Sequence, residues 1–323
     1  MLKMSQQGID ILQNKYGKRL LQQVLLKNYS TARVGGNATW FISVKNVIEL
    51  SDVIQTCWEH DQNYFLLGSG SNILFSDSGF EGLVILNHAK NIMINIVDET
   101  PMIQAESGAN LGLVARKAAL AGLSGLEWAS TIPGTIGGAV FGNAGAHDGD
   151  MNSNLLLAEI LQHDTGKSVW KNNDFEFRYR SSILKRQPGK RVILSASLNC
   201  RYDDPEKIKE RMNAFSNYRR QTQPPGASMG SMFKNPPGDY AGRLIEAAGL
   251  KGFKIGGVKV SEVHANFFVN DENATAMDIY QLVQHVDKTV KQKFDVQLAV
   301  EVEMVGFNQM SENYTADHGE ASI

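Results

Sequence analysis

The chain has 323 residues, of which 42% are hydrophobic and 20% charged, as expected of a globular protein with two or three domains. The formal net charge of −2 excludes a general attraction to nucleic acid or to membrane surfaces. Two cysteines are too few for a disulfide framework, the start MLKMSQQG does not resemble a secretory leader, and no apolar run approaches the ~20 residues of a membrane helix. We therefore expect a cytoplasmic protein.

Hydrophobic residues recur at helix or strand spacing along most of the chain. Periodicity, caps and helix-ending glycines predict helices over residues 5–27, 47–58, 110–121, 204–221, 240–248 and 274–294. Apolar or alternating runs predict strands over residues 40–44, 64–67, 83–86, 92–97, 102–106, 155–163, 168–170, 192–200, 263–269 and 296–304. Asn46 and Glu49 have the spacing of a capping box. Because long connections separate many strands, the predicted class is α+β.

A glycine-rich stretch, Gly122–His147, is the first candidate for a binding site. It holds seven glycines, and Gly134–Gly138 would let main-chain N–H groups approach an anion such as a phosphate. A second loop of small residues, Gly68–Asn72, follows a predicted strand, but it lacks the third glycine of a dinucleotide fingerprint and the Lys-Ser/Thr of a P-loop. Either loop by itself could be only a packed turn. Together they favour a dinucleotide cofactor held from both sides.

Other segments offer anion-binding or catalytic groups. Arg178 and Arg180 would share one side of an extended segment and could clamp a carboxylate, although an exposed surface pair is the alternative. Gly226–Gly230 matches a nucleophile elbow with His264 as base, but flanking prolines exclude the strand and helix that this motif needs. Residues 205–259 hold ten Lys/Arg against four Asp/Glu, an excess that would attract an acidic small substrate; the alternative is an ordinary solvated helix face that contributes half of those charges.

The last predicted strand carries two candidate acids, Glu301 and Glu303, on one face. One of them could enter a site, and periodicity does not decide which. The seven histidines show no metal-ligand spacing and no cysteine pair supports zinc, so we predict no metal.

Five motifs occur in a fixed order along the chain. They are LLGSGSNILFSD at 66–77, IPGTIGGAVFGNAGA at 132–146, FRYRSSIL at 177–184, GSMFKNP at 230–236 and LAVEVEMVG at 298–306. In this order they resemble the UDP-N-acetylenolpyruvoylglucosamine reductase (MurB) family of bacterial peptidoglycan synthesis. The short path from Arg180 to Ser231 resembles the family type that lacks an extra tyrosine-bearing loop.

The resemblance implies an FAD-binding domain of the vanillyl-alcohol-oxidase (PCMH) type, with lobes at 1–87 and 88–202. A substrate-binding domain at 203–306 and a disordered tail at 307–323 would follow. The implied activity is the NADPH-dependent reduction of UDP-N-acetylglucosamine enolpyruvate to UDP-N-acetylmuramate, which serves cell-wall biogenesis, cell shape and cell division. FAD would be the cofactor and NADPH the reductant, and the protein would be a monomer without nucleic-acid or membrane partners.

The resemblance also implies site residues. Arg180 would stabilise the developing negative charge, Ser231 would donate the proton, and Glu301 rather than Glu303 would be the catalytic acid. The residues implied to hold FAD are Gly68, Ser69, Gly70, Ser71, Asn72, Pro133, Gly134, Thr135, Gly137, Gly138 and Asn143. The residues implied to contact substrate are Lys234, Asn235 and, less directly, His264.

Two alternatives remain. Another FAD-dependent oxidase or dehydrogenase would keep the glycine loops without needing Ser231, Lys234 and Asn235. A flavin-free sugar-nucleotide binding protein would bind no flavin at all.

Overall fold

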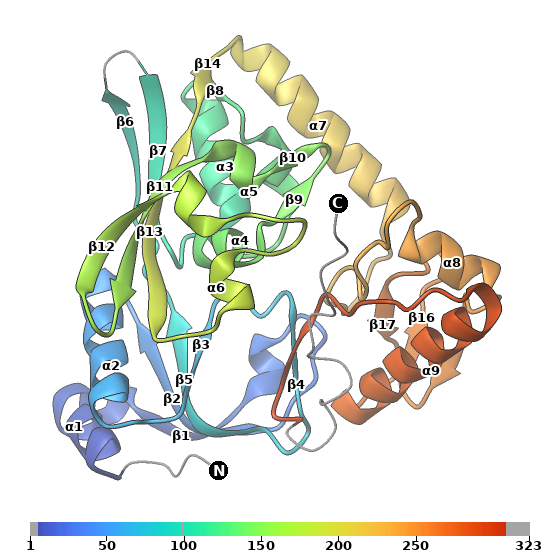
Figure 1. The fold of residues 1–323 in the computed structure, drawn as a ribbon, viewed down its shortest axis with the longest axis horizontal. Coiled ribbons are helices and arrows are strands. Elements are labelled where there is room, and N and C mark those ends of the chain that lie inside the picture. Colours follow the sequence, from blue (N-terminus) through green and yellow to red (C-terminus); the bar gives the residue numbers. More distant parts are fainter. Residues whose placement is uncertain (1–5, 98–99, 308–323) are drawn as a thin grey trace. The chain divides into compact units, whose positions relative to one another are not determined.

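The computed structural model describes residues 6–97 and 100–307 (Figure 1). The chain forms two compact units. Unit 1 takes the chain up to Gln23, Trp40–Ser69 and Gly82–Gln221, whereas unit 2 takes Val24–Thr39, Gly70–Glu81 and the chain from Thr222 on. The division at residues 87 and 202 that the sequence suggests stays a prediction. Within the described part of the chain, no helix combines the length and apolarity that crossing a membrane requires.

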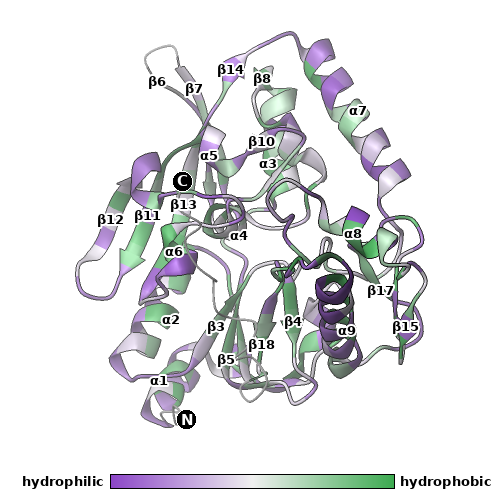
Figure 2. Ribbon diagram, turned by 45° about the vertical axis from the view of Figure 1, so that its right-hand side comes forward, coloured by the Kyte–Doolittle hydropathy of each residue, from purple (hydrophilic) through white to green (hydrophobic). Residues whose placement is uncertain are grey.

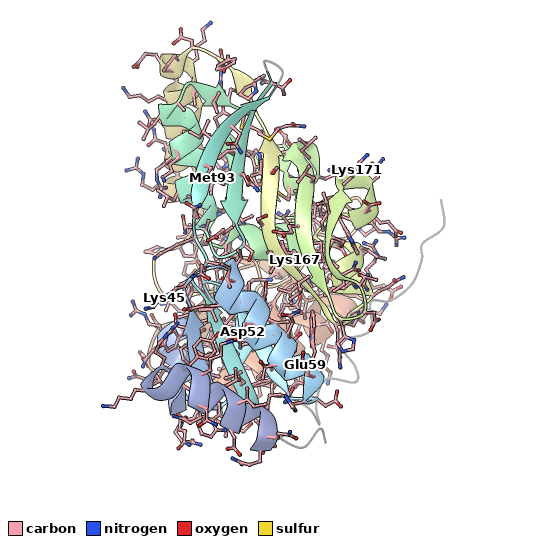
Figure 3. The ribbon with its side chains drawn as sticks, turned by 90° about the vertical axis from the view of Figure 1, so that its left-hand side faces the viewer. Lys45, Asp52, Glu59, Met93, Lys167 and Lys171 are labelled. Atoms are coloured by element: carbon pink, nitrogen blue, oxygen red, sulfur yellow. The ribbon has the colours of Figure 1, made fainter. Side chains whose placement is uncertain are left out.

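The first layer of unit 1 consists of two helices and most of a four-stranded sheet, whose residues 24–25, 37–39 and 80–81 are counted in unit 2. Its strands, in sheet order, are β1 (Leu21–Leu25), β2 (Asn37–Val44), β5 (Phe80–Asn87) and β3 (Tyr64–Leu67). Helices α1 (Gln6–Tyr16) and α2 (Val47–Glu59) share one apolar core with this sheet. Figure 3 labels Asp52 and Glu59 on α2, and Asp52 accepts from the Tyr16 hydroxyl of α1 at 2.6 Å.

Two predictions about these helices are wrong in detail. The helix predicted over 5–27 ends at Tyr16, because Gly17 adopts a left-handed φ of 55° and Leu21–Leu25 joins the sheet. Asn46 does cap α2 by accepting from the Ile48 and Glu49 N–H groups. Glu49 itself accepts from the Lys45 N–H and pairs with Arg19, so the reciprocal half of the capping box is absent.

The second layer of unit 1 is a five-stranded antiparallel sheet. Its strands, in sheet order, are β12 (Gly166–Lys171), β11 (Leu155–Gln162), β13 (Arg191–Asn199), β7 (Thr100–Glu106) and β6 (Ile92–Val97). Helices α3 (Leu111–Leu120) and α4 (Ile136–Gly142) belong to the apolar core that this sheet shares. The outer strands carry the labelled Lys167, Lys171 and Met93 in Figure 3.

Short elements complete unit 1. They are η1 (Gly17–Arg19), β8 (Leu123–Ser124), η3 (Glu127–Thr131), β9 (Gly145–Ala146), β10 (Gly149–Asp150), α5 (Met151–Asn154), η4 (Asn172–Phe175), α6 (Ile183–Arg186) and β14 (Arg201–Tyr202). The long helix α7 (Pro205–Thr222) buries only Ile208. Polar bonds anchor it instead, because Arg211 donates to the buried carboxylate of Glu127 at 2.7 Å.

Unit 2 has its own core, built around α9 (Ala276–Phe294) and α8 (Ala241–Ala247). Its other elements are η2 (Leu26–Tyr29), the antiparallel sheet β15 (Lys254–Ile255), β16 (Val258–Val260) and β17 (Phe268–Asn270), and the parallel pair β18 (Glu303–Val305) and β4 (Ile73–Phe75). Figure 2 shows the hydrophilic face of α9. Asp77 accepts from the Ala276 and Met277 N–H groups and so tethers the β4 segment to the start of α9.

Three predictions for the end of the chain need correction. The strand predicted over 263–269 is regular only from Phe268, and the strand predicted over 296–304 is regular only at Glu303–Val305. In the latter segment, the Leu298 N–H donates to the Asp287 carboxylate rather than to a neighbouring strand. Phe307, the first residue of the predicted tail, is buried and stacks on Tyr280 with ring centroids 5.3 Å apart. Residues 308–323 lie outside the described residues.

Candidate functional site

The two glycine loops meet within unit 1. Gly68 ends β3, and a Cβ placed on it would lie 2.7 Å from the Thr135 Oγ1. Glycine is therefore needed at 68 for the two segments to approach each other. Ser69 also belongs to unit 1, whereas Gly70, with a φ of 64°, begins the part of the loop that belongs to unit 2. The predicted proximity of the two loops is thus present for Gly68 and Thr135.

The N–H groups at the start of α4 are hydrogen-bonded within the protein, whereas the sequence led us to expect them to be available to an anion. The Ile136 N–H donates to the Ala109 carbonyl at 2.9 Å, and the Gly137 N–H donates to the Ser107 carbonyl at 2.8 Å. The Gly138 N–H donates to the Thr135 Oγ1 at 3.3 Å. Gly137 has another role, because a Cβ there would meet the Ser107 Cβ at 3.0 Å.

Sequence reasoning missed two hydroxyls that directly precede this loop. Among the described residues, no hydrogen-bond partner satisfies the buried Ser130 Oγ or Thr131 Oγ1. A buried hydroxyl without a partner is costly, so these two atoms mark a strained spot directly before the loop. The signal in the sequence was the Ser-Thr pair beside IPGTIGG. Pro133 is exposed in the same loop, and Gly134 has a φ of 148°, which favours glycine.

A tight turn rather than an extended strand presents Arg180. Arg178 and Ser181 exchange backbone hydrogen bonds, and Arg180 has a left-handed φ of 52°. The extended conformation on which the prediction of a shared side depends is therefore wrong. The Arg180 Nη2 donates to the Gly145 carbonyl at 2.7 Å, which orients the guanidinium.

The side chain of Asn143 stabilises this turn through hydrogen bonds. It is 4% exposed, and its amide Nδ2 donates to the Arg178 carbonyl at 3.0 Å. Its Oδ1 accepts from the Asn152 N–H at 3.0 Å. The side chain thus bonds within the protein, and direct contact of Asn143 with a cofactor stays a prediction.

A pocket of about 410 Å³ in unit 2 brings together Ser231, Asn235 and His264, which the sequence placed in one substrate site. The remaining lining residues are Tyr240, Gly242, Arg243, Glu246, Val263, Ala265 and Asn266. Sequence reasoning missed these because they come from α8 and from the loop before β17. Lys234 and Glu301 do not line this pocket.

Asn266 holds the Ser231 segment in place. Its backbone carbonyl accepts from the Met232 N–H at 2.8 Å. Its side-chain Oδ1 accepts from the Phe233 N–H at 2.9 Å, and its Nδ2 donates to the Phe233 carbonyl at 2.8 Å. The residue is only 2% exposed, so a satisfied polar side chain fixes the main chain next to Ser231.

The segment that contains Glu301 is hydrogen-bonded to the main chain of residues 232–234. The Glu301 N–H donates to the Met232 carbonyl at 2.9 Å, and the Lys234 N–H donates to the Ala299 carbonyl at 2.8 Å. The Asn72 Nδ2 donates to the Glu301 carbonyl at 3.1 Å. Three predicted site segments of unit 2 are therefore hydrogen-bonded to one another.

The charges around the pocket are partly neutralised. Hydrogen bonding to Arg243 holds the pKa of Asp239 at about 2, so this acid is ionised beside the pocket. Of the basic excess in residues 205–259, Arg211 pairs with Glu127 and Arg219 donates to the Thr131 carbonyl, so both bond within unit 1. Within residues 6–97 and 100–307, no cluster of His, Cys, Asp and Glu is suited to a metal ion.

Two family profiles match successive parts of the chain. An FAD binding domain matches residues 38–170, and the C-terminal domain of UDP-N-acetylenolpyruvoylglucosamine reductase matches residues 221–305. Together with the mixed sheets and helices, these matches define an FAD-binding oxidoreductase of the α+β class. The predicted fold class and the prediction that FAD is the cofactor are both confirmed.

Whole-chain comparisons identify the family. The chain is 40% identical to the UDP-N-acetylenolpyruvoylglucosamine reductase of Bacillus velezensis, over 93% of this chain and 99% of that protein. It is 39% identical to the same enzyme of Caldicellulosiruptor saccharolyticus, over 90% and 94% of the two chains. The crystal structure of UDP-N-acetylenolpyruvylglucosamine reductase from Thermus caldophilus matches with a TM-score of 0.75 and 34% identity, over 89% of this chain and 99% of that one. The chain belongs to the UDP-N-acetylenolpyruvoylglucosamine reductase family.

Proposed function

We propose that this protein reduces the enolpyruvyl group of UDP-N-acetylglucosamine enolpyruvate with NADPH, giving UDP-N-acetylmuramate for peptidoglycan synthesis. The observation that carries the proposal is the pocket of unit 2. Ser231, Asn235 and His264 line it together, in a chain whose close relatives are named for this activity. The cytoplasmic location and monomeric state stay predictions.

The loops of unit 1 would hold the cofactor. The Gly68–Ser69 turn and the Pro133–Gly138 loop would let the backbone approach FAD closely, whereas the Ile136, Gly137 and Gly138 N–H groups bond within the protein. When bound there, FAD would supply the hydride for reduction of the substrate's vinyl group, with NADPH as the reductant. The remaining catalytic tasks fall to side chains of this chain.

Arg180 would stabilise charge during the reaction, and Ser231 would donate a proton. The guanidinium of Arg180, fixed by the Gly145 carbonyl, would stabilise negative charge that develops on the substrate carboxylate. The Ser231 Oγ would donate a proton to the carbon that does not receive the hydride. Glu301 would support the enolic intermediate, and Lys234, Asn235 and His264 would bind the substrate.

Substitution of Ser231 tests the proposal. Ser231→Ala should leave bleaching of the flavin by NADPH intact and reduce turnover by about 10²-fold or more, because the proton donor is lost. Ser228→Ala is the matched control, since Ser228 precedes Ser231 in the same loop and does not line the pocket. Stopped-flow spectroscopy under anaerobic conditions follows bleaching with NADPH and its reversal with the enolpyruvyl substrate. Normal turnover of Ser231→Ala would refute the assignment of the proton donor.

The same flavin measurements on the wild-type protein test the proposed activity itself. A flavin that bleaches with NADPH but is not reoxidised by the enolpyruvyl substrate would support a different FAD-dependent oxidase or dehydrogenase. A protein that binds no FAD would refute the proposal altogether.

A further inference from the structure

The parallel strands β4 and β18 lie side by side in unit 2 (Figure 2), and Asn72 is the residue directly before β4. The first pair of this ladder joins Ile73 to Glu303. The Asn72 backbone carbonyl accepts from the Glu303 N–H at 3.0 Å. Its side-chain Nδ2 donates to the Glu301 carbonyl at 3.1 Å, beyond the point where the ladder begins. Asn72 therefore bonds the segment that contains the candidate acid at two places.

The main chain of Glu301 is hydrogen-bonded at both of its polar atoms. Its N–H donates to the Met232 carbonyl at 2.9 Å, and its carbonyl accepts from the Asn72 Nδ2. Each bond restrains one of the two rigid peptide planes that meet at the Glu301 Cα. The orientation of these planes sets the direction in which the side chain leaves the main chain. The residue next to Ser231 and the side chain of Asn72 together determine where the Glu301 side chain is directed.

Single bonds rather than regular strand pairing hold the residues directly before β18. The Leu298 N–H donates to the Asp287 carboxylate, and regular pairing begins only at Glu303. Glu301 lies between these two positions. Because it is outside the strand, neighbouring ladder bonds would not compensate for the loss of its bond to Asn72.

The strand that follows Asn72 fixes its position. Leu74 of β4 is fully buried in the core that this strand shares with α9. At the other end of the strand, Asp77 accepts from two N–H groups at the start of α9. The core of unit 2 therefore holds in place the residue that restrains Glu301.

We propose that Asn72 is a positioning residue that acts on the reaction through Glu301, rather than by contact with FAD. This inference rests on the proposed function, in which Glu301 is the catalytic acid for the enolpyruvyl substrate. Without the Nδ2 bond, the Glu301 side chain would sample more directions, and a misplacement of about 1 Å can slow a chemical step by about 10²-fold. The step that uses Glu301 should therefore slow, whereas reduction of the flavin by NADPH should not.

Removing the Nδ2 donor tests the proposal, since Asn72→Ala keeps the backbone bond to Glu303. In the FAD-loaded enzyme, bleaching by NADPH should stay within about 2-fold of wild type. Reoxidation by the enolpyruvyl substrate should slow by about 10-fold or more, with KM changed by less than about 3-fold. Asn72→Asp, which keeps the size of the side chain but cannot donate at pH 8, should show the same pattern.

Ser78→Ala is the matched control, because Ser78 is exposed in the segment after β4 and its hydroxyl bonds that of Ser76. It should behave as the wild type in both half-reactions. Reoxidation at the wild-type rate in both Asn72 variants would overturn the inference.

A double-mutant cycle shows whether Asn72 acts through Glu301. Glu301→Gln removes the charge of the side chain that Asn72 is inferred to position. Adding Asn72→Ala to Glu301→Gln should slow reoxidation by less than about 2-fold further, because the effects of coupled residues do not add. A further slowing as large as in Asn72→Ala alone would show independent roles and overturn the inference.

Two readouts need no turnover. Flavin release from the loaded enzyme on dilution, followed by flavin fluorescence, should be the same in Asn72→Ala as in wild type. Hydrogen exchange of the amides over residues 298–304, measured by mass spectrometry, should be faster in Asn72→Ala and unchanged in Ser78→Ala. Faster flavin release, or unchanged exchange, would overturn the inference. Faster exchange in a protein whose wild-type flavin is not reoxidised by the enolpyruvyl substrate would refute the proposed function and leave the positioning of Glu301 standing.

Discussion

Replacing Asn266 by aspartate changes one hydrogen bond at a buried position next to Ser231. The introduced carboxylate can still accept from the Phe233 N–H, but it cannot donate to the Phe233 carbonyl as Nδ2 does at 2.8 Å. The carbonyl then faces a negative charge at a position that is only 2% exposed. A buried acceptor without its donor costs about 1–3 kcal/mol, and the buried charge adds to this. We expect Asn266→Asp to lower the free energy of unfolding by about 2–4 kcal/mol at pH 8.

Most of this loss in the free energy of unfolding should disappear at acidic pH. A protonated carboxyl matches the amide, since its carbonyl accepts from Phe233 N–H and its hydroxyl donates to the Phe233 carbonyl. Burial raises the pKa of the introduced carboxyl above its unfolded value of about 3.9. Proton binding therefore favours the folded state, fully below the unfolded pKa, and this stabilisation is lost as pH rises through the folded pKa.

Urea unfolding of the FAD-free protein at pH 8 and pH 5, followed by tryptophan fluorescence, measures the effect. The deficit of Asn266→Asp relative to wild type should shrink by about 1 kcal/mol or more at pH 5, the value of roughly one pKa unit. Asn266→Ala is the control, because it leaves the Phe233 N–H and carbonyl unpaired at every pH. Equal deficits at both pH values in the aspartate variant would refute the account of Asn266 as a donor to Phe233.

Two further predictions concern unit 1. Gly137→Ala should yield protein with a lower flavin content after purification, read from the visible spectrum, because its Cβ would meet Ser107 at 3.0 Å; Gly142→Ala in the same helix is the control, as its Cβ meets nothing within 4 Å. Equal flavin content in both variants would contradict the close-packing role of Gly137. Arg211→Ala should lower the free energy of unfolding at pH 7 by about 1–2 kcal/mol, a value reduced by solvent screening of the half-exposed guanidinium. Burial by itself would raise the pKa of Glu127, but hydrogen bonds from its own backbone, Arg211 and others hold it below the ordinary range. The contribution of Arg211 is therefore present above the unfolded pKa of about 4.3 and should fade as pH falls through the folded pKa, and a deficit that does not depend on pH would contradict the pairing.

Several elements could be predicted because their signals are local. The helix α3 ends where Gly122 adopts a φ of 71°, as the glycine indicated, and α9 begins after the capping residue Thr275. The strands predicted over 155–163 and 168–170 correspond to β11 and β12, which pair as an antiparallel hairpin. In each case the residues that decide the structure are neighbours in the chain.

Other predictions failed where distant segments compete for the same backbone. Residues 21–25 have helical periodicity, yet they join a sheet with β2. Residues 296–302 alternate like a strand, but their N–H groups bond in part to Asp287 and to the Ser231 segment. The hydrophobic periodicity of a segment does not show which distant group its backbone N–H groups will bond.

The class of fold, FAD binding and the family could be predicted from the motifs and their order along the chain, because that information needs no coordinates. Only the tertiary structure showed that the N–H groups of Ile136 and Gly137 are occupied, that the Ser130 hydroxyl is buried without a partner among the described residues, and that Asn266 clamps the main chain beside Ser231. Whether a polar group is available to a ligand depends on which distant atoms surround it. That is set by packing between segments far apart in the chain, which residue type and spacing do not encode.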